Sequence, residues 1–465
     1  MRLIKRFPIL DIIFFAVPLV CGIGYLLAFY PGIITFDSIA QWHQVSSFSF
    51  DNWHPAYHSI LIWLITRLRD TLAIFVLFQV CVFSAVLAYG LRAFKDMGVP
   101  APMLVILAIF ISIVPMNGLL VVTIWKDILF STAVLLLAIV LLKIIMSGGA
   151  WLANGWNALL LGVTAANVSL LRHNGFPVAF GMLLIIALVY SRRKWVFLAL
   201  GIAVLCIGFI VGPVYEVFRV NRQQSQSFGV VFIHPIAAHV RNEASFSLDE
   251  QAYLKTIFPL EIAWPYSCHD ATVLFYSGVN FSEVQKDPMQ AAKIFGRLSL
   301  EAPLVTARHF YCLSSFVWQI SQPDGVYLET VVTTNHTAGH REAWRKYQPY
   351  IEQNSRAPEL RNLITSILER YARFDPGMIG WRPAIYLYVF SAAVVFLAFR
   401  RKNPLILILL VPVYLQTLII AFTAQLQAVR YQYPVYLVSM LFTVPLIYLA
   451  VKQPNPKQPE QTKPD

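Results

Sequence analysis

Residues 9–30 read ILDIIFFAVPLVCGIGYLLAFY, an apolar run that contains one charge, Asp11. An α-helix needs about 20 such residues to cross the ~30 Å hydrocarbon core of a bilayer. Similar runs recur along the chain, in which 58% of the 465 residues are hydrophobic and 13% are charged. Soluble domains carry about 25% charged residues. The pattern therefore predicts an all-α polytopic membrane protein with about ten transmembrane helices.

The expected spans form two groups, seven before residue 214 and three after residue 381. They are expected at residues 9–30, 71–92, 101–121, 127–146, 155–171, 175–191, 195–213, 382–399, 404–423 and 433–451. The first run follows Arg2, Lys5 and Arg6, as a signal peptide would. It is longer than a typical signal core and lacks a clear cleavage site, so we expect it to be retained as a span.

Lysine and arginine are concentrated in alternate loops, which indicates an orientation because cytoplasmic loops carry an excess of both. With the N-terminus inside, every inside loop is basic, including 92–95, 192–194 and 400–402. We therefore expect both termini in the cytoplasm. The formal charge of +12 would suggest nucleic acid for a soluble protein. Here the cations lie in clusters between apolar runs, so nucleic acid is not expected as a partner.

Residues 55–69 decide whether this orientation holds. The apolar part, 57–68, offers about 12 residues and is followed by Arg69 and Asp70. Counting it as a span would invert everything after it and place two basic loops outside. We interpret 55–69 as a helix along the outer interface. A short true span is the alternative.

The chain divides into four parts. Residues 1–213 hold seven spans and a first outer loop at 31–70, 382–451 hold three spans, and 452–465 read as a disordered cytoplasmic tail. Residues 214–381 are polar but rich in aromatic and aliphatic residues, which predicts a folded, mainly α extracytoplasmic domain. Cys268 and Cys312 both fall there and could form a disulfide.

Four groups of polar residues fall on the outer side in this orientation. They are the first outer loop with Asp37 and His54, then Lys126 and Asp127, then Arg172 to Asn174, and lastly Arg430 and Tyr431. An ionisable residue at membrane depth costs roughly 2.5–3.5 kcal/mol and usually marks a function or a paired site. Any one group could be structural, with arginines reaching outer headgroups. Their placement on one side favours a common site.

The chemistry of these side chains is complementary. A carboxylate such as Asp37 can accept a proton from an attacking hydroxyl or amine. Lys126, Arg172 and Arg430 suit a phosphate or pyrophosphate, which they can hold through charge-assisted hydrogen bonds. His54 could hold a phosphate oxygen, a metal or a proton. A base opposite such cations is what transfer from a phosphate-activated donor requires.

The order of these motifs resembles the GT-C glycosyltransferases. The residues that match are Asp37 after the first span, His54-Pro55-Ala56-Tyr57 at an interfacial helix, and Arg430-Tyr431-Gln432-Tyr433-Pro434 near the last span. The sequence around Asp127 corresponds loosely to the second acidic position of that family. Ala56 stands where the family often has a second proline, and the large polar segment precedes the last three spans instead of following them.

The resemblance implies a glycosyltransferase that takes a sugar from a polyprenyl-phosphate or -pyrophosphate carrier. Asp37 would be the general base, and a bacterial inner membrane would be the location. An extracytoplasmic glycan, lipid or protein would be the acceptor. The carrier's phosphate would be bound by residues from the same four groups, namely His54, Lys126, Asp127, Arg172, Asn174, Arg430 and Tyr431. A divalent cation shared by Asp37 and Asp127 is a further expectation, since metal dependence varies within that family.

Two other classes of protein stay open. An O-antigen-ligase- or polymerase-like enzyme would also grip a pyrophosphate with arginines, but it would need basic residues of the large segment such as Arg219, Arg222, His234 and His239. Such an enzyme would not need Asp37. A secondary transporter would show internal repeats and charges near the bilayer midplane. No repeat is evident in this sequence.

Overall fold

The computed structural model describes residues 9–221, 227–330, 354–374 and 379–452. The expected tail at 453–465, the cations of residues 1–8 and Arg222 lie outside this range. The described residues form helices and no β-strand, with three isolated parallel bridges between loops. The expectation of an all-helical chain is confirmed for them.

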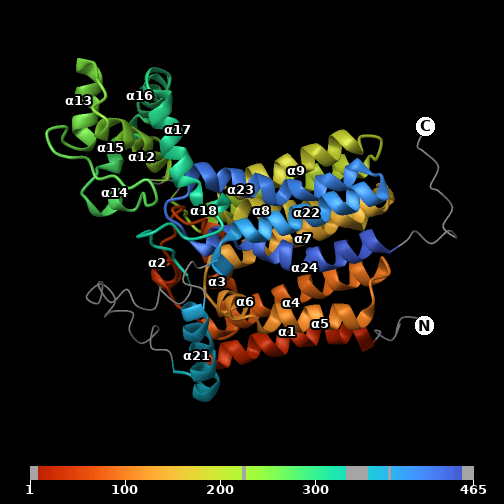
Figure 1. Cartoon of the computed structure of the whole chain (residues 1–465). Helices are drawn as coiled ribbons and strands as arrows, with labels where there is room; N and C mark the ends of the chain where they lie inside the picture. Colours follow the sequence, from red (N-terminus) through yellow and green to blue (C-terminus); the bar gives the residue numbers. More distant parts are fainter. Residues whose placement is uncertain (1–8, 222–226, 331–353, 375–378, 453–465) are drawn as a thin grey trace.

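Most helices form one elongated bundle (Figure 1). Seven helical segments are long and apolar enough to cross a membrane, which confirms a multi-pass membrane protein. Their bounds are α1 Ile9–Ala28, α4 Leu72–Asp96, α7 Lys126–Met146, α10 Trp195–Phe209 with its extension to Val217, α22 Pro383–Arg401, η7 Pro404–Leu410 with α23 Val411–Thr423, and η8 Val429–Gln432 with α24 Tyr433–Val451. The extension of α10 consists of η2 Ile210–Val214 and α11 Tyr215–Val217.

Three further regions of the bundle bear on the expected count of ten. Helices α5 Ala101–Ile113 and α6 Pro115–Val121 would make an eighth span, bent by 65° at the break before Pro115. Helices α8 Gly155–Leu171 and α9 Gly175–Val189 are apolar and lie along the others, but have 17 and 15 residues. Both are shorter than the ~20 residues of a standard span. The exact count therefore stays a prediction.

The long apolar helices differ in how far the rest of the bundle buries them. Helices α7 and α24 are the most buried of the long apolar helices. Helix α10 is the least buried, and Phe197, Leu205 and Phe209 on it are 54%, 72% and 62% exposed. Large apolar side chains at such exposure fit a surface that faces lipid hydrocarbon.

The bundle has two ends, which we name by what they carry. The termini end holds Ile9 and Val451, and the lobe end holds α2 Phe36–Ser47, α3 Ala56–Thr66 and a helical lobe (Figure 1). At the termini end, Arg400 Nε and Arg401 Nη2 donate to the carbonyls of Ala450 and Leu449. These cations therefore cap the last turn of α24, where the helix dipole favours positive charge.

Helix α3, expected as an interfacial helix at 55–69, has 11 residues. At 1.5 Å per residue it is about 16 Å long, roughly half the thickness of the hydrocarbon core. It packs against α2 and α4 at the lobe end. Its place along the outer interface stays a prediction.

The polar stretch at 214–381 contains two kinds of structure. The lobe has its own hydrophobic core, with Ile233, Leu254, Trp264 and Leu298 at its centre. Its helices are α12 Ser227–Arg241, α13 Leu248–Ile257, α14 Val273–Tyr276, α15 Phe281–Lys286, α16 Pro288–Glu301 and α17 Pro303–Leu313. A disulfide joins Cys268 to Cys312. The second part, which includes α18 Ser315–Trp318 and α21 Pro358–Phe374, packs into the core of the bundle through residues such as Phe316 and Ile364.

Candidate functional site

The loop that follows α1 is fixed to the segment before α7, and this places Asp37 beside Lys126. Ile33 donates to the carbonyl of Val122 and accepts from Ile124, at 2.9 and 3.0 Å. Ser38 Oγ donates to the carbonyl of Ile124 at 2.7 Å, and Trp125 Nε1 donates to Thr35 Oγ1 at 2.6 Å.

Thr35 also begins helix α2. Its hydroxyl caps the backbone N–H of Ser38, and the Ser38 side chain caps the backbone of Thr35 in return. This capping box satisfies donors at the helix start. Asp37 therefore lies in the first turn of α2, where the helix dipole stabilises a carboxylate.

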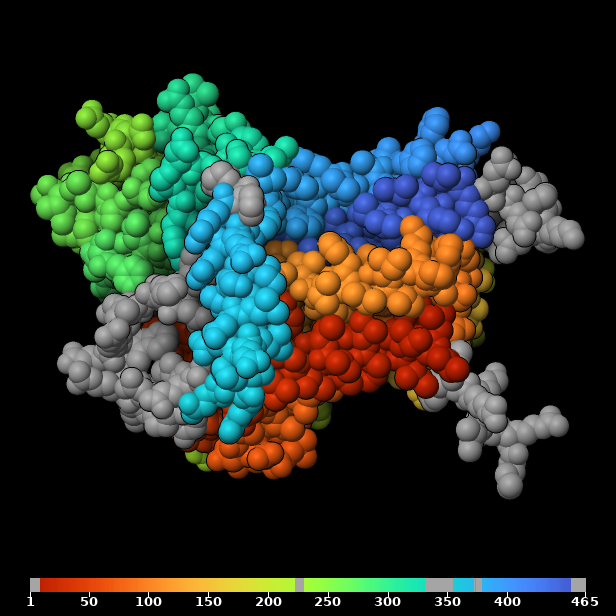
Figure 2. All heavy atoms as spheres, turned by 60° about the horizontal axis from the view of Figure 1, so that its bottom comes forward, coloured from red at the N-terminus to blue at the C-terminus, as the bar shows by residue number. Residues whose placement is uncertain are grey.

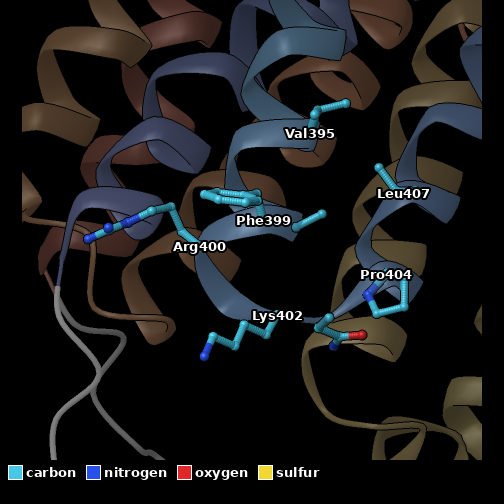
Figure 3. A pocket seen from close by; sticks show the side chains of 8 residues that line it. Val395, Phe399, Arg400, Lys402, Pro404 and Leu407 are labelled. Carbon is cyan, nitrogen blue, oxygen red and sulfur yellow. The ribbon is translucent and has the colours of Figure 1, made fainter.

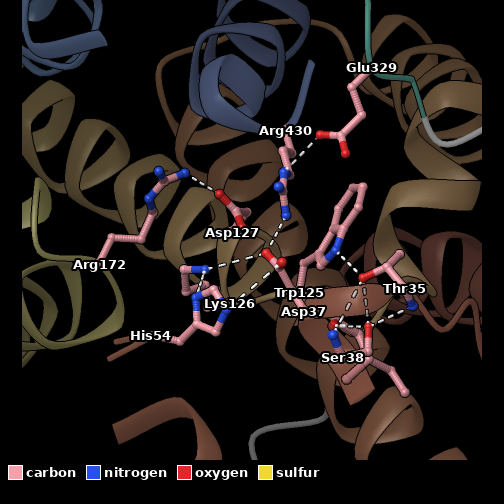
Figure 4. Close-up of polar contacts among 11 residues, drawn as sticks. Thr35, Asp37, Ser38, His54, Trp125, Lys126, Asp127, Arg172, Glu329 and Arg430 are labelled. Carbon is pink, nitrogen blue, oxygen red and sulfur yellow. Dashed lines mark hydrogen bonds and ion pairs between the residues drawn. The ribbon is translucent and has the colours of Figure 1, made fainter. Parts of the chain in front are cut away.

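Three side chains contact Asp37, and a fourth, Glu329, contacts one of them, Arg430. We call the five residues the Asp37 cluster: Asp37, His54, Lys126, Glu329 and Arg430 (Figure 4). Arg430 Nη1 donates to Asp37 Oδ2 at 2.5 Å, and Lys126 Nζ lies 3.7 Å from the same oxygen. His54 Nε2 lies 3.8 Å from Asp37 Oδ1. The side chains of the cluster are 10–18% exposed.

Arg430 is held between two carboxylates and two aromatic rings. Its Nε lies 3.0 Å from Glu329 Oε2, but the two atoms are not aligned for a hydrogen bond. The guanidinium lies 4.7 Å from the ring centre of Trp125 and 5.2 Å from that of Tyr431. Stacking on aromatic faces adds attraction and fixes the plane of a guanidinium.

His54 is held by the turn that precedes α3. Asn52 Oδ1 accepts from the backbone N–H of Ala56, and a bridge pairs Asp51 with Asn221 beyond α11. Lys126 Nζ lies 2.8 Å from His54 Nδ1. An ammonium has only donors, so His54 accepts through Nδ1 and carries its proton on Nε2, which faces Asp37.

The electrostatics of Asp37 and His54 follow from this packing. Burial alone would raise the pKa of Asp37, but the positive charges of Arg430 and Lys126 hold it well below its usual range. Burial, and then repulsion from Lys126, lowers the pKa of His54 from 6.5 to about 3. At neutral pH, Asp37 is therefore a carboxylate and His54 is neutral.

Asp127 and Arg172 form a second ion pair next to the Asp37 cluster. Asp127 Oδ1 accepts from Arg172 Nη1, while its Oδ2 is buried without a hydrogen-bond partner. The guanidinium of Arg172 lies 5.1 Å from the ring centre of Tyr431. The ring of Tyr431 therefore lies close to the guanidinium groups of both Arg172 and Arg430.

Asn174 is placed differently from the other predicted residues. Its Nδ2 donates to Gln416 Oε1, and Gln416 Nε2 donates to the carbonyl of Tyr431. In the structure, Asn174 therefore supports the turn that carries Arg430 instead of contacting the Asp37 cluster.

Glu329 is the residue of the cluster that the sequence did not indicate. It follows α18 by a loop, and a bridge pairs it with Ala428, two residues before Arg430. Its N–H donates to the carbonyl of Gln427, and its carbonyl accepts from Val429, at 2.8 and 3.1 Å. Burial raises the pKa of Glu329, although Arg430 opposes that effect. No motif surrounds it in the sequence.

A divalent cation between Asp37 and Asp127 does not fit this arrangement. Asp37 already faces Arg430 and Lys126, and Asp127 is paired with Arg172. A metal ion would have to displace these cations or be repelled by them. Within the described ranges, one grouping has three close metal-ligand atoms, Cys268, His269 and Cys312, and its two thiols are joined in the disulfide.

A hollow of about 530 Å³ lies at the other end of the bundle, between α22 and η7 (Figure 3). Its walls are largely apolar, with Val395 and Phe399 on one side and Leu407 on the other. It is separated from the Asp37 cluster by the length of α22, so it is not part of this site.

The chain was compared with protein-family models, curated proteins and solved structures, and none of them matches it.

Proposed function

We propose that this protein is a membrane glycosyltransferase that moves a sugar from a polyprenyl-phosphate or -pyrophosphate carrier to an extracytoplasmic acceptor. One observation carries the proposal. A carboxylate in the first turn of α2 lies within 4 Å of cations from two other segments, 2.5 Å from Arg430 and 3.7 Å from Lys126. These are the residue types that a base and a leaving-group site require.

The charges of the side chains in this region balance. Three carboxylates, Asp37, Asp127 and Glu329, face three cations, Lys126, Arg172 and Arg430. A phosphate that binds here must therefore take cations from carboxylates. Arg430 and Lys126 are the candidates, because both already contact the same oxygen of Asp37.

The proposed reaction uses that exchange. The acceptor hydroxyl forms a bond to the anomeric carbon as the bond from that carbon to the carrier's phosphate breaks. The bonding electron pair leaves with the phosphate, where Arg430 and Lys126 stabilise the added charge. The hydroxyl proton moves to Asp37, a better base once the phosphate has offset the cations that lower its pKa.

The proposed placement in the membrane follows from the basic loops. The termini end, which carries Arg92, Lys143 and Arg400, would face the cytoplasm under the positive-inside pattern. The lobe and the Asp37 cluster would then be extracytoplasmic, and a bacterial inner membrane is the proposed location. The Cys268–Cys312 disulfide supports this side, because disulfides persist in oxidising compartments.

The other two classes fit the site less well. A ligase- or polymerase-like enzyme would use basic residues of the lobe, but two of those expected for it, His234 and His239, are 2% and 1% exposed. A transporter would hold its charges midway along the helices. The Asp37 cluster instead lies at the lobe end, where Figure 1 places α2.

The test replaces the proposed base. Purified protein in lipid vesicles is incubated with hexoses and pentoses linked to polyprenyl phosphate and pyrophosphate, together with a cell-envelope extract that supplies the acceptor, and release of the carrier phosphate is followed by mass spectrometry. Asp37→Asn should abolish release at unchanged protein abundance. The matched control is Asp70→Asn, an exposed carboxylate in the same outer loop, which should keep full activity. Undiminished release by Asp37→Asn would end the proposal.

A further inference from the structure

Helix α21, Pro358–Phe374, crosses the end of the bundle instead of running along it (Figures 1 and 2). The start of α21 and the residues just before it are fixed to α1. The N–H of Arg356 donates to the carbonyl of Leu27 at 2.8 Å. The guanidinium groups of Arg356 and Arg361 lie over the rings of Tyr30 and Phe29. Because the transmembrane helices lie along the bundle, a helix perpendicular to them at their ends lies in the plane of the membrane surface.

Around its axis, α21 has a buried apolar side, an exposed apolar side and an exposed polar side. Ile364 and Leu368 are 5% and 9% exposed and pack into the core of the bundle. Leu363 and Ile367, one helical turn apart, are 55% and 44% exposed. At about 100° per residue, Thr365 and Glu369 lie on the side opposite Leu363 and Ile367, and both are exposed.

Helix α1, against which α21 packs, exposes apolar side chains of its own. Leu27 and Val20 of α1 are 42% and 66% exposed on a helix long and apolar enough to span the membrane. A helix surrounded by water would turn one apolar side to the protein and polar residues to the solvent. The second apolar side, Leu363 and Ile367, therefore needs an apolar environment of its own.

We propose that α21 is seated in the lipid leaflet at the lobe end. Leu363 and Ile367 lie among the upper parts of the acyl chains, the side with Thr365 and Glu369 faces water, and Arg370 lies at the level of the phosphates. An amphipathic helix in an interface has this division of sides. The proposal concerns a lipid surface and stands whether or not the protein transfers sugars.

The test measures the surroundings of single positions. In a variant with Cys21, Cys81 and Cys206 replaced by alanine and the disulfide kept, Leu363→Cys, Ile367→Cys and the control Thr365→Cys are each labelled with an environment-sensitive fluorophore. The protein is reconstituted into phosphatidylcholine vesicles. Each label is then challenged with nitroxide-bearing phosphatidylcholine and, separately, with a water-soluble paramagnetic nickel complex. Each variant must elute from gel filtration as the unsubstituted protein does.

We expect labels at 363 and 367 to be quenched several-fold more by the lipid nitroxide than the label at 365. The nickel complex should show the reverse order. Equal quenching of all three positions by the nickel complex would place the helix in water and overturn the proposal. Protection of 363 and 367 from both quenchers would mean that protein covers them, which would overturn it as well.

Discussion

Arg430 lies between two carboxylates, and only Asp37 is aligned to accept a hydrogen bond from it. If Glu329 were neutralised, Arg430 would lose the carboxylate that faces its Nε and would be held less firmly in the position where it meets a phosphate. We therefore expect Glu329→Gln to slow carrier-phosphate release. One charge-assisted contact is worth about 1.5–3 kcal/mol, which corresponds to about a 10- to 100-fold change in rate. The vesicle assay described for Asp37 measures it.

The matched control is Glu359→Gln, which changes an exposed glutamate in the first turn of α21. Its rate should stay within twofold of the unsubstituted protein, about the effect of a surface substitution of up to 0.5 kcal/mol. If Glu329→Gln behaves like this control, Glu329 does not position Arg430 for the reaction.

At the scale of residues, the sequence located the charged groups but not all their partners. Asp37, His54, Lys126 and Arg430 were predicted from motifs at the ends of spans, and the structure brings them together. Glu329 lies in a loop with no motif, and its position depends on a backbone bridge to Ala428. Such pairing between distant loops leaves no periodic signal in a single sequence.

Helices α8 and α10 approach closely at Gly162. A Cβ placed there would lie 2.5 Å from the carbonyl oxygen of Ala199, a backbone atom that cannot rotate away. Small residues allow such contacts between membrane helices. We expect Gly162→Ala to lower the melting temperature in detergent, since overpacking costs roughly 1–3 kcal/mol.

Gly201 supplies the matched control on the facing helix. A Cβ there would meet nothing within 4 Å. Alanine favours a helix interior over glycine by roughly 0.5–1 kcal/mol, so Gly201→Ala should leave the melting temperature unchanged or raise it. A Gly162→Ala protein as stable as Gly201→Ala would contradict the close packing of these two helices.

At the scale of elements, apolar runs indicated where helices form, but not how they end or bend. The run at 101–121 divides at Val114, where Pro115 begins a second helix at 65° to the first. Proline disfavours helical geometry in the residue before it. The three bridges that join site loops were not predictable, because each pairs segments that are far apart in the chain.

The lobe should lose stability in acid because of two histidines in its interior. Burial lowers the pKa of His234 to about 4 and that of His309 to about 3, from 6.5. As the pH falls below 6.5, the unfolded chain takes up protons that the folded lobe does not. The stability present above pH 6.5 is therefore lost on acidification, by up to about 1.4 kcal/mol per pH unit for each histidine.

Thermal unfolding in detergent at about pH 7.5 and about pH 5 measures this loss, which linkage predicts as a lower melting temperature at the acid pH. His309→Gln keeps a group that can accept the hydroxyl proton of Tyr266, which lies 3.0 Å from His309 Nδ1, but it does not titrate. Its melting temperature should therefore fall less between the two pH values. An equal fall in both proteins would show that His309 does not contribute.

At the scale of the molecule, composition predicted a membrane protein and a folded polar segment. It did not predict how that segment divides between the lobe and the core of the bundle. Residues 230–298 form a separate core, whereas Phe316, Leu328 and Ile364 belong to the core of the bundle. Both parts contain aliphatic and aromatic residues throughout. A single sequence therefore could not show which of them pack together.

The proposed orientation places the lobe outside the cell and the termini end inside, and it can be tested without knowledge of the reaction. In the variant that lacks Cys21, Cys81 and Cys206, Ser277→Cys puts a thiol on the exposed surface of the lobe, beside α14. Lys402→Cys puts one at the exposed C-cap of α22. A membrane-impermeant maleimide applied to intact spheroplasts should label position 277, and label 402 only after permeabilisation. The reverse pattern would place the Asp37 cluster on the cytoplasmic side. Transfer from an outward-facing lipid carrier would then be excluded, even if Asp37 proved essential.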